Sequence, residues 1–340
     1  MLASQLTDML RFLLILACSA IAIGAQAPPA AKPFKVTAEL GVPIVIGAES
    51  FIIGSKEKIE TASERELTLT SADLAISFPN RQENIVAAAG EKLLILRGSI
   101  RNPEKTTASL INSTDLIGLR LWQAYKGTGK FKFVAHFDPA GPQYIRKELK
   151  PGESAKFISV WRIPSDFMDF RLGLMYYKPQ KLAWYNLTST IGKIHSAFAD
   201  AGGLGTSDTA KVAAGETFDF GALEIRAGTV SEPEMIAGMP KPAAGHRYVV
   251  NLAVTNRQML PSRWGWQYFT VELIGSGGTV LKAYPDIIDQ ATGRSWYGDL
   301  NAGASLNARF LFNSVSATVP RALRLTMLET GRTVEVALVP

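Results

Sequence analysis

The sequence predicts an all-β protein built of two tandem antiparallel β-sandwiches. Three observations predict this class. Apolar residues alternate with polar ones, as in residues 94–101 and 333–338, which is typical of strands with one buried face. Glycine-containing turns, such as Gly127–Gly129 and Gly275–Gly278, separate these runs. The pattern also recurs about 151 residues later in the chain, which indicates an internal duplication.

The first element, residues 1–27, is predicted to be a secretory signal peptide. Arg11 precedes an apolar run over residues 12–23, the usual layout of an export signal. A bilayer-spanning helix needs about 20 apolar residues, which is more than this run provides. No second long apolar stretch follows it, so we expect no transmembrane helix in the mature chain. Cleavage after Ala27 follows a small-x-small pattern but leaves a proline beside the cut, whereas cleavage after Gly24 avoids it. Both sites stay open, and the expected location is the periplasm or the cell exterior.

The single cysteine, Cys18, lies inside this apolar run. The stretch Ile15–Cys18 loosely resembles the lipobox of bacterial lipoproteins, which makes Cys18 a candidate lipidation site and the protein a candidate membrane-anchored lipoprotein. The alternative is that Cys18 is a small apolar residue of the export segment. In either case no thiol remains for a disulfide, a thiolate metal site or a cysteine nucleophile.

The mature chain is long enough for two domains of ordinary size. Domain 1 is expected at residues 63–190 and domain 2 at residues 209–340. Residues 28–62 precede the first copy of the repeat and match nothing before the second copy. We therefore expect an N-terminal extension that lays one or two strands on domain 1.

The linker between the domains, residues 191–208, is predicted to contain a short helix. Ile191, Ile194 and Phe198 share one helical stripe within residues 190–201, and Gly202 with Gly203 would end the helix.

Matching segments define the repeat. Leu67–Leu69 aligns with Phe218–Phe220, and Leu149–Gly152 aligns with Leu300–Gly303, both at a displacement of 151 residues. Residues 96–102 match residues 250–256 at a displacement of 154. The difference implies small insertions and deletions in surface loops, where they are best tolerated.

Each copy carries the same turn chemistry. In the first copy a strand ends in Asn102, a Leu-x-x-Gly turn follows at Leu149–Gly152, and a later strand closes in Ile163–Pro164; the second copy has Asn256, Leu300–Gly303 and Val319–Pro320. The series resembles the uncharacterised immunoglobulin-like domains of bacterial lipoproteins and secreted antigens. The resemblance implies two immunoglobulin-like β-sandwiches in a bacterial cell envelope, and it implies no catalytic residue.

The charge of the chain is unevenly distributed. The formal net charge is +6, and residues 28–203 carry 23 Lys and Arg against 17 Asp and Glu, whereas residues 204–340 carry 12 of each. The basic residues are spread singly, which indicates an ordinary solvated face and leaves a weak preference for anionic surfaces through domain 1 as the alternative. Nothing predicts a nucleic-acid partner.

No motif for catalysis, metal or cofactor binding withstands inspection, so we expect a protein that is not an enzyme and has no cofactor. Gly127–Lys130 lacks the first glycine and the hydroxyl of a phosphate-binding loop. The chain has no Gly-x-Ser-x-Gly sequence. Asp286, Asp289 and Asp299 could offer oxygens to calcium, but the alternating ligands of calcium loops are missing.

Aromatic residues are concentrated in residues 262–273. If residues 264–273 form one strand, Phe269 faces the core while Trp264, Trp266 and Tyr268 point outward. Such a row of rings could dock a partner chain or stack on sugar rings. The alternatives are a bulge near Pro261 or Gly265 that turns the tryptophans inward, or packing of the row within the protein. The nearby Trp296 and Tyr297 complete the predicted binding residues.

The sequence therefore predicts an exported, non-catalytic binding or scaffolding protein of the bacterial cell envelope. Its expected partner is an envelope or extracellular protein. The alternative is a carbohydrate-binding or adhesive protein that uses the aromatic row of domain 2 to bind a surface glycan.

Overall fold

The structure is a computed structural model that describes residues 34–46, 65–81, 83–111, 120–122, 131–140, 146–175 and 181–338. Within these residues the regular structure is β-strand apart from one short 3-10 turn, η2 (Ser276–Gly278). None of the described elements is a helix long and apolar enough to span a lipid bilayer. The expected signal peptide and Cys18 lie outside the described residues. The predicted all-β class is confirmed.

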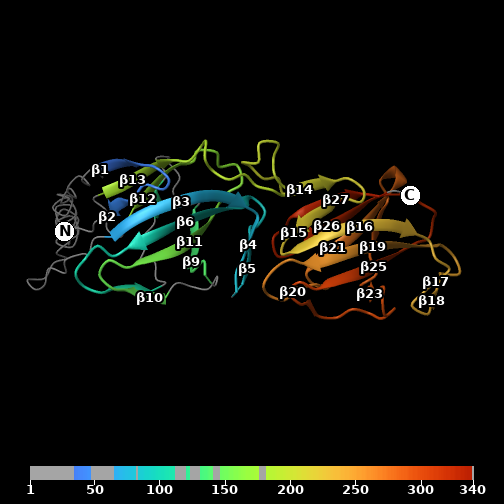
Figure 1. Ribbon diagram of the computed structural model, residues 1–340. Coiled ribbons are helices and arrows are strands. Elements are labelled where there is room, and N and C mark those ends of the chain that lie inside the picture. Colours follow the sequence, from blue (N-terminus) through green and yellow to red (C-terminus); the bar gives the residue numbers. More distant parts are fainter. Residues whose placement is uncertain are drawn as a thin grey trace, which may run out of the picture. The chain divides into compact units, whose positions relative to one another are not determined.

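The first half of the chain folds into two main sheets, drawn from blue to green in Figure 1. The buried residues Leu94, Leu96 and Ile100 alternate along the central strand β6 and face the core. The larger sheet has the order β2 (Ile44–Ile46), β3 (Arg65–Ala75), β6 (Glu91–Arg101), β11 (Ser154–Pro164), β9 (Lys132–Phe137). The other has the order β1 (Phe34–Ala38), β13 (Lys181–Asn186), β12 (Arg171–Met175), β8 (Arg120–Trp122). Two small pairs are β4 (Ser77–Pro79) with β5 (Asn84–Val86), and β7 (Ala108–Ile111) with β10 (Arg146–Leu149).

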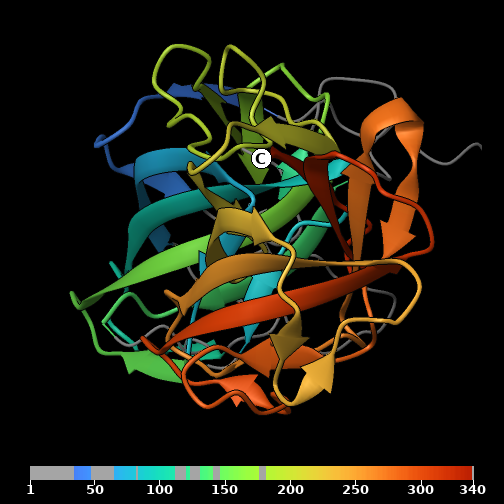
Figure 2. The same ribbon diagram turned by 90° about the vertical axis from the view of Figure 1, so that its right-hand side faces the viewer.

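The second half also folds into two main sheets, and Figure 2 shows its long yellow, orange and red strands side by side. One sheet has the order β15 (Thr217–Phe220), β16 (Leu223–Ser231), β19 (His246–Asn256), β25 (Ser305–Ser314), β23 (Ile287–Asp289). The other has the order β14 (Thr209–Val212), β27 (Thr333–Ala337), β26 (Pro320–Met327), β21 (Phe269–Gly275), β22 (Val280–Lys282). Two short pairs are β17 (Met235–Ile236) with β18 (Met239–Pro240), and β20 (Ser262–Arg263) with β24 (Asp299–Leu300).

The two halves share the same order of strands along the chain. β1 and β2 occupy the sheet edges that β14 and β15 occupy in the second half. The expectation that residues 28–62 have no counterpart is therefore wrong for their described part, because these residues pair with β13 and β3 as regular edge strands.

The pairing register also corrects the alignment of the copies. Leu67 lies opposite Ile100, and Ile225 lies opposite Val254, so Leu67 corresponds to Ile225 and not to Phe218. Phe218 instead lies in β15 opposite Ile225, as Ile44 lies in β2 opposite Leu67.

A buried asparagine ends the equivalent strands β6 and β19. Asn102 Nδ2 donates to the backbone oxygens of Thr106 (2.7 Å) and Leu149 (3.0 Å). Asn256 Nδ2 donates to the backbone oxygens of Leu260 (2.8 Å) and Leu300 (2.8 Å). Neither side chain is exposed. The predicted Asn and Leu-x-x-Gly sequences therefore meet in space, and each asparagine joins two segments of chain.

The linker contains no helix, so that prediction is wrong. Ile191, Ile194 and Phe198 are buried, as a stripe would be, but they lie in irregular chain. The backbone at Gly192 pairs with β3: Gly192 N donates to Ala72 O, and Leu74 N donates to Gly192 O. Glycine inside a helix costs about 1 kcal/mol relative to alanine, so this pairing is the more favourable use of the segment.

Buried apolar side chains of both halves and of the linker form one continuous cluster. A buried arginine, Arg332, crosses from the second half to the first. Its guanidinium donates to the carbonyl oxygens of Ala87 (3.2 Å), Ala88 (3.2 Å), Glu91 (2.5 Å) and Ser207 (2.7 Å). Its charge is thus met by backbone oxygens.

Lys92, also fully buried, ties β6 to two neighbouring segments. Its Nζ donates to the carbonyl oxygens of Ser165 (3.1 Å), Phe167 (2.6 Å) and Leu204. Burial lowers the pKa of Lys92 from 10.5 to about 8, while Asp200 and Asp166 oppose the change.

Candidate functional site

The aromatic stretch of residues 262–273 does not form a single strand. β20 ends at Arg263, a turn follows in which Tyr268 N donates to Gly265 O (2.9 Å), and β21 begins at Phe269. The turn directs Trp264 into the core, where it is fully buried and its ring centroid lies 4.4 Å from that of Phe269. The predicted outward row is therefore wrong for Trp264. The inward alternative, with a break near Gly265, describes this ring.

The other predicted binding residues differ in exposure. Trp266 is 53% exposed and Tyr297 is 74% exposed. Tyr268 is half-buried, with the Arg263 guanidinium 5.4 Å from its ring centroid, and Trp296 is half-buried against the core. Of the predicted rings, Trp266 and Tyr297 are therefore the ones that are exposed to a partner.

Trp266 borders a groove that we call the aromatic groove. It lies where the edge strands β22 and β23 are joined by residues 283–286, and its volume is about 210 Å³. Ala283 N donates to Val271 O (3.0 Å) in one sheet and Tyr284 N to Leu311 O (2.7 Å) in the other. The connection therefore crosses the open edge of the sandwich and leaves the groove beside it.

The groove has an apolar floor and an aromatic rim. Phe269, Ile287 and Phe310 form part of the floor and are almost wholly buried. Trp266 and Tyr284 stand at the rim, and Tyr284 is 49% exposed. Two exposed rings beside an apolar hollow are an arrangement that binds an apolar side chain of a partner.

Charged side chains lie on one wall of the aromatic groove. Glu272 and Lys282 face each other across β21 and β22. Glu272 also accepts a hydrogen bond from Arg324 Nη1 (3.3 Å), whereas Lys282 makes no ion pair with a described residue. Lys282 is therefore a free cation beside the apolar hollow.

Asp286 and Asp289, two of the aspartates considered as calcium ligands, accept hydrogen bonds from residues of their own loop. Asp289 accepts bonds from Ala291 N and Thr292 Oγ1, both at 2.9 Å. Asp286 Oδ2 accepts a bond from Ser295 Oγ (2.5 Å), while its Oδ1 is buried without a partner. Across the described residues, no group of three His, Cys, Asp or Glu side chains is arranged to hold a metal ion.

Tyr284 and Pro285 are the groove residues that sequence reasoning missed. Their signal was the Tyr-Pro pair that follows Ala283 soon after Val280–Lys282, because proline restricts where an edge strand can continue. The pattern shows where the strand ends, but not that the ring would lie beside Trp266.

No protein-family model matches the chain, and no curated protein matches it. Among solved structures, an uncharacterized β-sandwich protein from Clostridium difficile 630 is similar over 38% of this chain and 93% of its own, with 14% sequence identity and a TM-score of 0.29. A serine-rich repeat protein from Streptococcus agalactiae is similar over 79% of this chain and 92% of its own, with 8% identity and a TM-score of 0.17.

Proposed function

We propose that the protein is an exported, non-catalytic binding protein of the bacterial cell envelope, and that it holds an extended segment of a partner protein at the aromatic groove. One observation carries the proposal: Trp266 and Tyr284 are exposed at the rim of an apolar hollow, at the open edge of a β-sandwich.

The edge strand β22 supplies the second part of the binding mode. It ends the sheet β14-β27-β26-β21-β22, so one side of its backbone is open to pair with an extended segment. An apolar side chain of that segment enters the aromatic groove, and Lys282 attracts an acidic neighbour. Backbone pairing supplies affinity, and the groove supplies specificity.

Origin and location follow as parts of the same proposal. The shared strand order and the matching bonds of Asn102 and Asn256 support a tandem duplication of one immunoglobulin-like unit. Residues 1–27 direct export, and Cys18 is the candidate for a lipid anchor; a mature protein beginning at Cys18 with the mass of an attached lipid would establish the anchor. The basic first half would favour a position beside anionic lipid.

Site-specific cross-linking in the producing cell tests the binding site. A photoreactive benzoyl-phenylalanine replaces Trp266, and in a matched control it replaces Val315, which is 91% exposed and lies outside the groove. We expect irradiation to give a discrete cross-linked product at position 266 and none at position 315. Equal products at both positions, or none at 266, would contradict the proposal.

A competition experiment tests the partner class. A peptide of the cross-linked segment should bind purified protein and quench the fluorescence of Trp266, and Tyr284→Ala should weaken binding about tenfold, as loss of a rim ring does. Quenching by cell-wall polysaccharides in place of the peptide would favour a glycan ligand. Stacking on a row of three rings is not proposed, because Trp264 is buried.

A further inference from the structure

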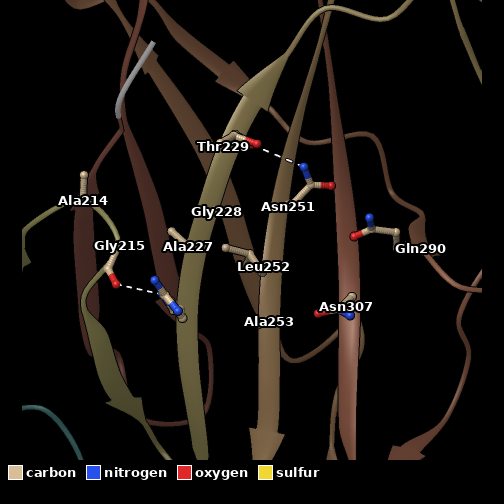
Figure 3. A pocket seen from close by; sticks show the side chains of 11 residues that line it. Ala214, Gly215, Ala227, Gly228, Thr229, Asn251, Leu252, Ala253, Gln290 and Asn307 are labelled. Carbon is tan, nitrogen blue, oxygen red and sulfur yellow. Dashed lines mark hydrogen bonds between the residues drawn. The ribbon is translucent and has the colours of Figure 1, made fainter.

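A second groove lies on a different surface of the second half, over the outer face of β16, β19 and β25 (Figure 3). We call it the polar groove. Its volume is about 400 Å³, within the range of small-ligand sites. None of the residues that line it is aromatic or acidic.

A β-bulge opens the polar groove. The register of β16 on β19 shifts between Ala227 and Val230, so Gly228 and Thr229 together oppose Asn251. A side chain at position 228 would begin 3.2 Å from the Asn251 backbone oxygen, and glycine keeps that space empty. Bulges commonly redirect side chains in this way.

The equivalent surface of the first half carries charged side chains. Pairing registers place Arg97 where the second half has Asn251, and Lys156 where it has Asn307. Arg97 is paired with Asp73 across the bulge of β3. The polar groove therefore has uncharged amides at two positions where the first half has charged side chains.

The lining is rich in hydrogen-bonding groups that the protein does not use. The amides of Asn307 and Gln290 are exposed and make no side-chain hydrogen bond with a described residue, and Figure 3 shows both at one side of the groove. Asn251 lies between them and Arg226, but its Nδ2 donates to Thr229 O at 3.5 Å and its Oδ1 is buried. The exposed amides of Asn307 and Gln290 can each donate and accept at once, as vicinal hydroxyl groups require of a partner.

Arg226 is the one charged residue among those that line the polar groove. Its Nε donates to Gly215 O (2.9 Å), which fixes the guanidinium, and its two terminal nitrogens bond to no described group. With no acidic side chain in the lining, this fork is free to bind a carboxylate through two parallel hydrogen bonds.

We propose that the polar groove binds an acidic saccharide, with the carboxylate of a uronic acid on Arg226 and ring hydroxyls on Gln290 and Asn307. An apolar or peptide ligand suits it less. The apolar residues of the same face, Val249, Ile288 and Leu311, are already covered by Ile236 of β17, so no apolar pocket remains for a side chain. The proposal does not rest on the aromatic groove or its partner.

Isothermal titration calorimetry of the mature protein at pH 7 and 0.15 M salt tests it with two probes. One is trigalacturonic acid and the other is the neutral galactose trisaccharide of the same length. We expect the acidic trisaccharide to bind at least tenfold more tightly. Arg226→Gln should weaken binding of the acidic probe at least tenfold and leave that of the neutral probe unchanged, and Asn307→Ala should weaken both.

Lys156→Gln is the matched control, since it removes a positive charge from the equivalent face of the first half. It should leave both affinities unchanged. Equal weakening by Lys156→Gln and Arg226→Gln would show unspecific attraction and overturn the site, as would no binding of either probe at about 10 mM. Both altered side chains are exposed, and an unchanged melting temperature confirms folding. The cross-linking expected at position 266 does not depend on whether the saccharide probes bind, so the two proposals can fail separately.

Discussion

Asn102 and Asn256 form equivalent hydrogen bonds in the two halves of the chain. Each side-chain amide donates to the carbonyl oxygen four residues ahead and to that of the leucine that begins the Leu-x-x-Gly turn. Each backbone oxygen also accepts a bond from the glycine of that turn, Gly152 or Gly303. The asparagine therefore fixes the turn from its side chain and its backbone together.

We expect Asn256→Ala to lower the free energy of unfolding by about 3 kcal/mol. It removes the Asn256 donor from the buried carbonyl oxygen of Leu300 and from the partly buried one of Leu260, and each unsatisfied buried group costs about 1–3 kcal/mol. Urea unfolding measures the change. Asn313→Ala, at an exposed amide that accepts a bond from Arg247, is the control and should cost about 1 kcal/mol or less. Equal losses would contradict a special role for Asn256.

Replacing Arg332 by methionine should lower the free energy of unfolding by about 3 kcal/mol or more. The change removes the guanidinium donor from four carbonyl oxygens that meet at the junction, and buried acceptors that lose a donor are costly. Arg324→Met removes only partly exposed ion pairs with Glu272 and Glu335, so we expect about 1 kcal/mol or less. Thermal melts of the two variants in parallel provide the comparison.

Stability should depend on the protonation of Lys92. Burial places its folded-state pKa at about 8, below the 10.5 of the unfolded chain. Between these values the unfolded state binds more protons, so the contribution of Lys92 to the free energy of unfolding rises with pH from about 8 to 10.5. The measurement is the difference between wild type and Lys92→Met in urea unfolding at several pH values. A difference that stays flat across the window would contradict the shift.

Trp264 and Trp266 should differ sharply in stability. Trp264→Ala empties a fully buried site between Phe269 and Phe310 and should cost about 3–5 kcal/mol. Trp266→Ala removes a ring that is 53% exposed and should cost about 1 kcal/mol or less. Guanidinium unfolding, followed by far-ultraviolet circular dichroism, gives both values. A large loss in Trp266→Ala would make this ring structural and would weaken the proposed site.

The all-β class could be predicted from the sequence because alternation follows directly from the pleat. Along β25, Leu306, Ala308, Phe310 and Phe312 are buried, as a period of two requires. The edge strands before residue 62 were harder to predict, because β2 spans only Ile44–Ile46 and so short a strand shows little alternation of apolar and polar residues.

The wrong predictions arose where one local sequence pattern is compatible with two structures. The stripe of Ile191, Ile194 and Phe198 predicts burial correctly, but irregular chain docked on β3 buries it as well as a helix would. Trp264 lies in the core because a turn at Gly265 breaks the expected strand, and the sequence does not reveal whether the strand is continuous or broken near Pro261 or Gly265. The polar groove depends on a bulge, and the extra residue of a bulge is visible only once strands are paired.

The contact of Arg332 with backbone oxygens has an evolutionary consequence. Every peptide unit carries a carbonyl group, so the anchoring points at Ala87, Ala88, Glu91 and Ser207 demand no particular side chains in return. Relatives of this protein are free to vary the side chains at those four positions as long as the backbone of both segments, residues 87–91 and Ser207, keeps its path. Arg332 would then keep its contacts with the first half and the linker while the surface residues of each half change.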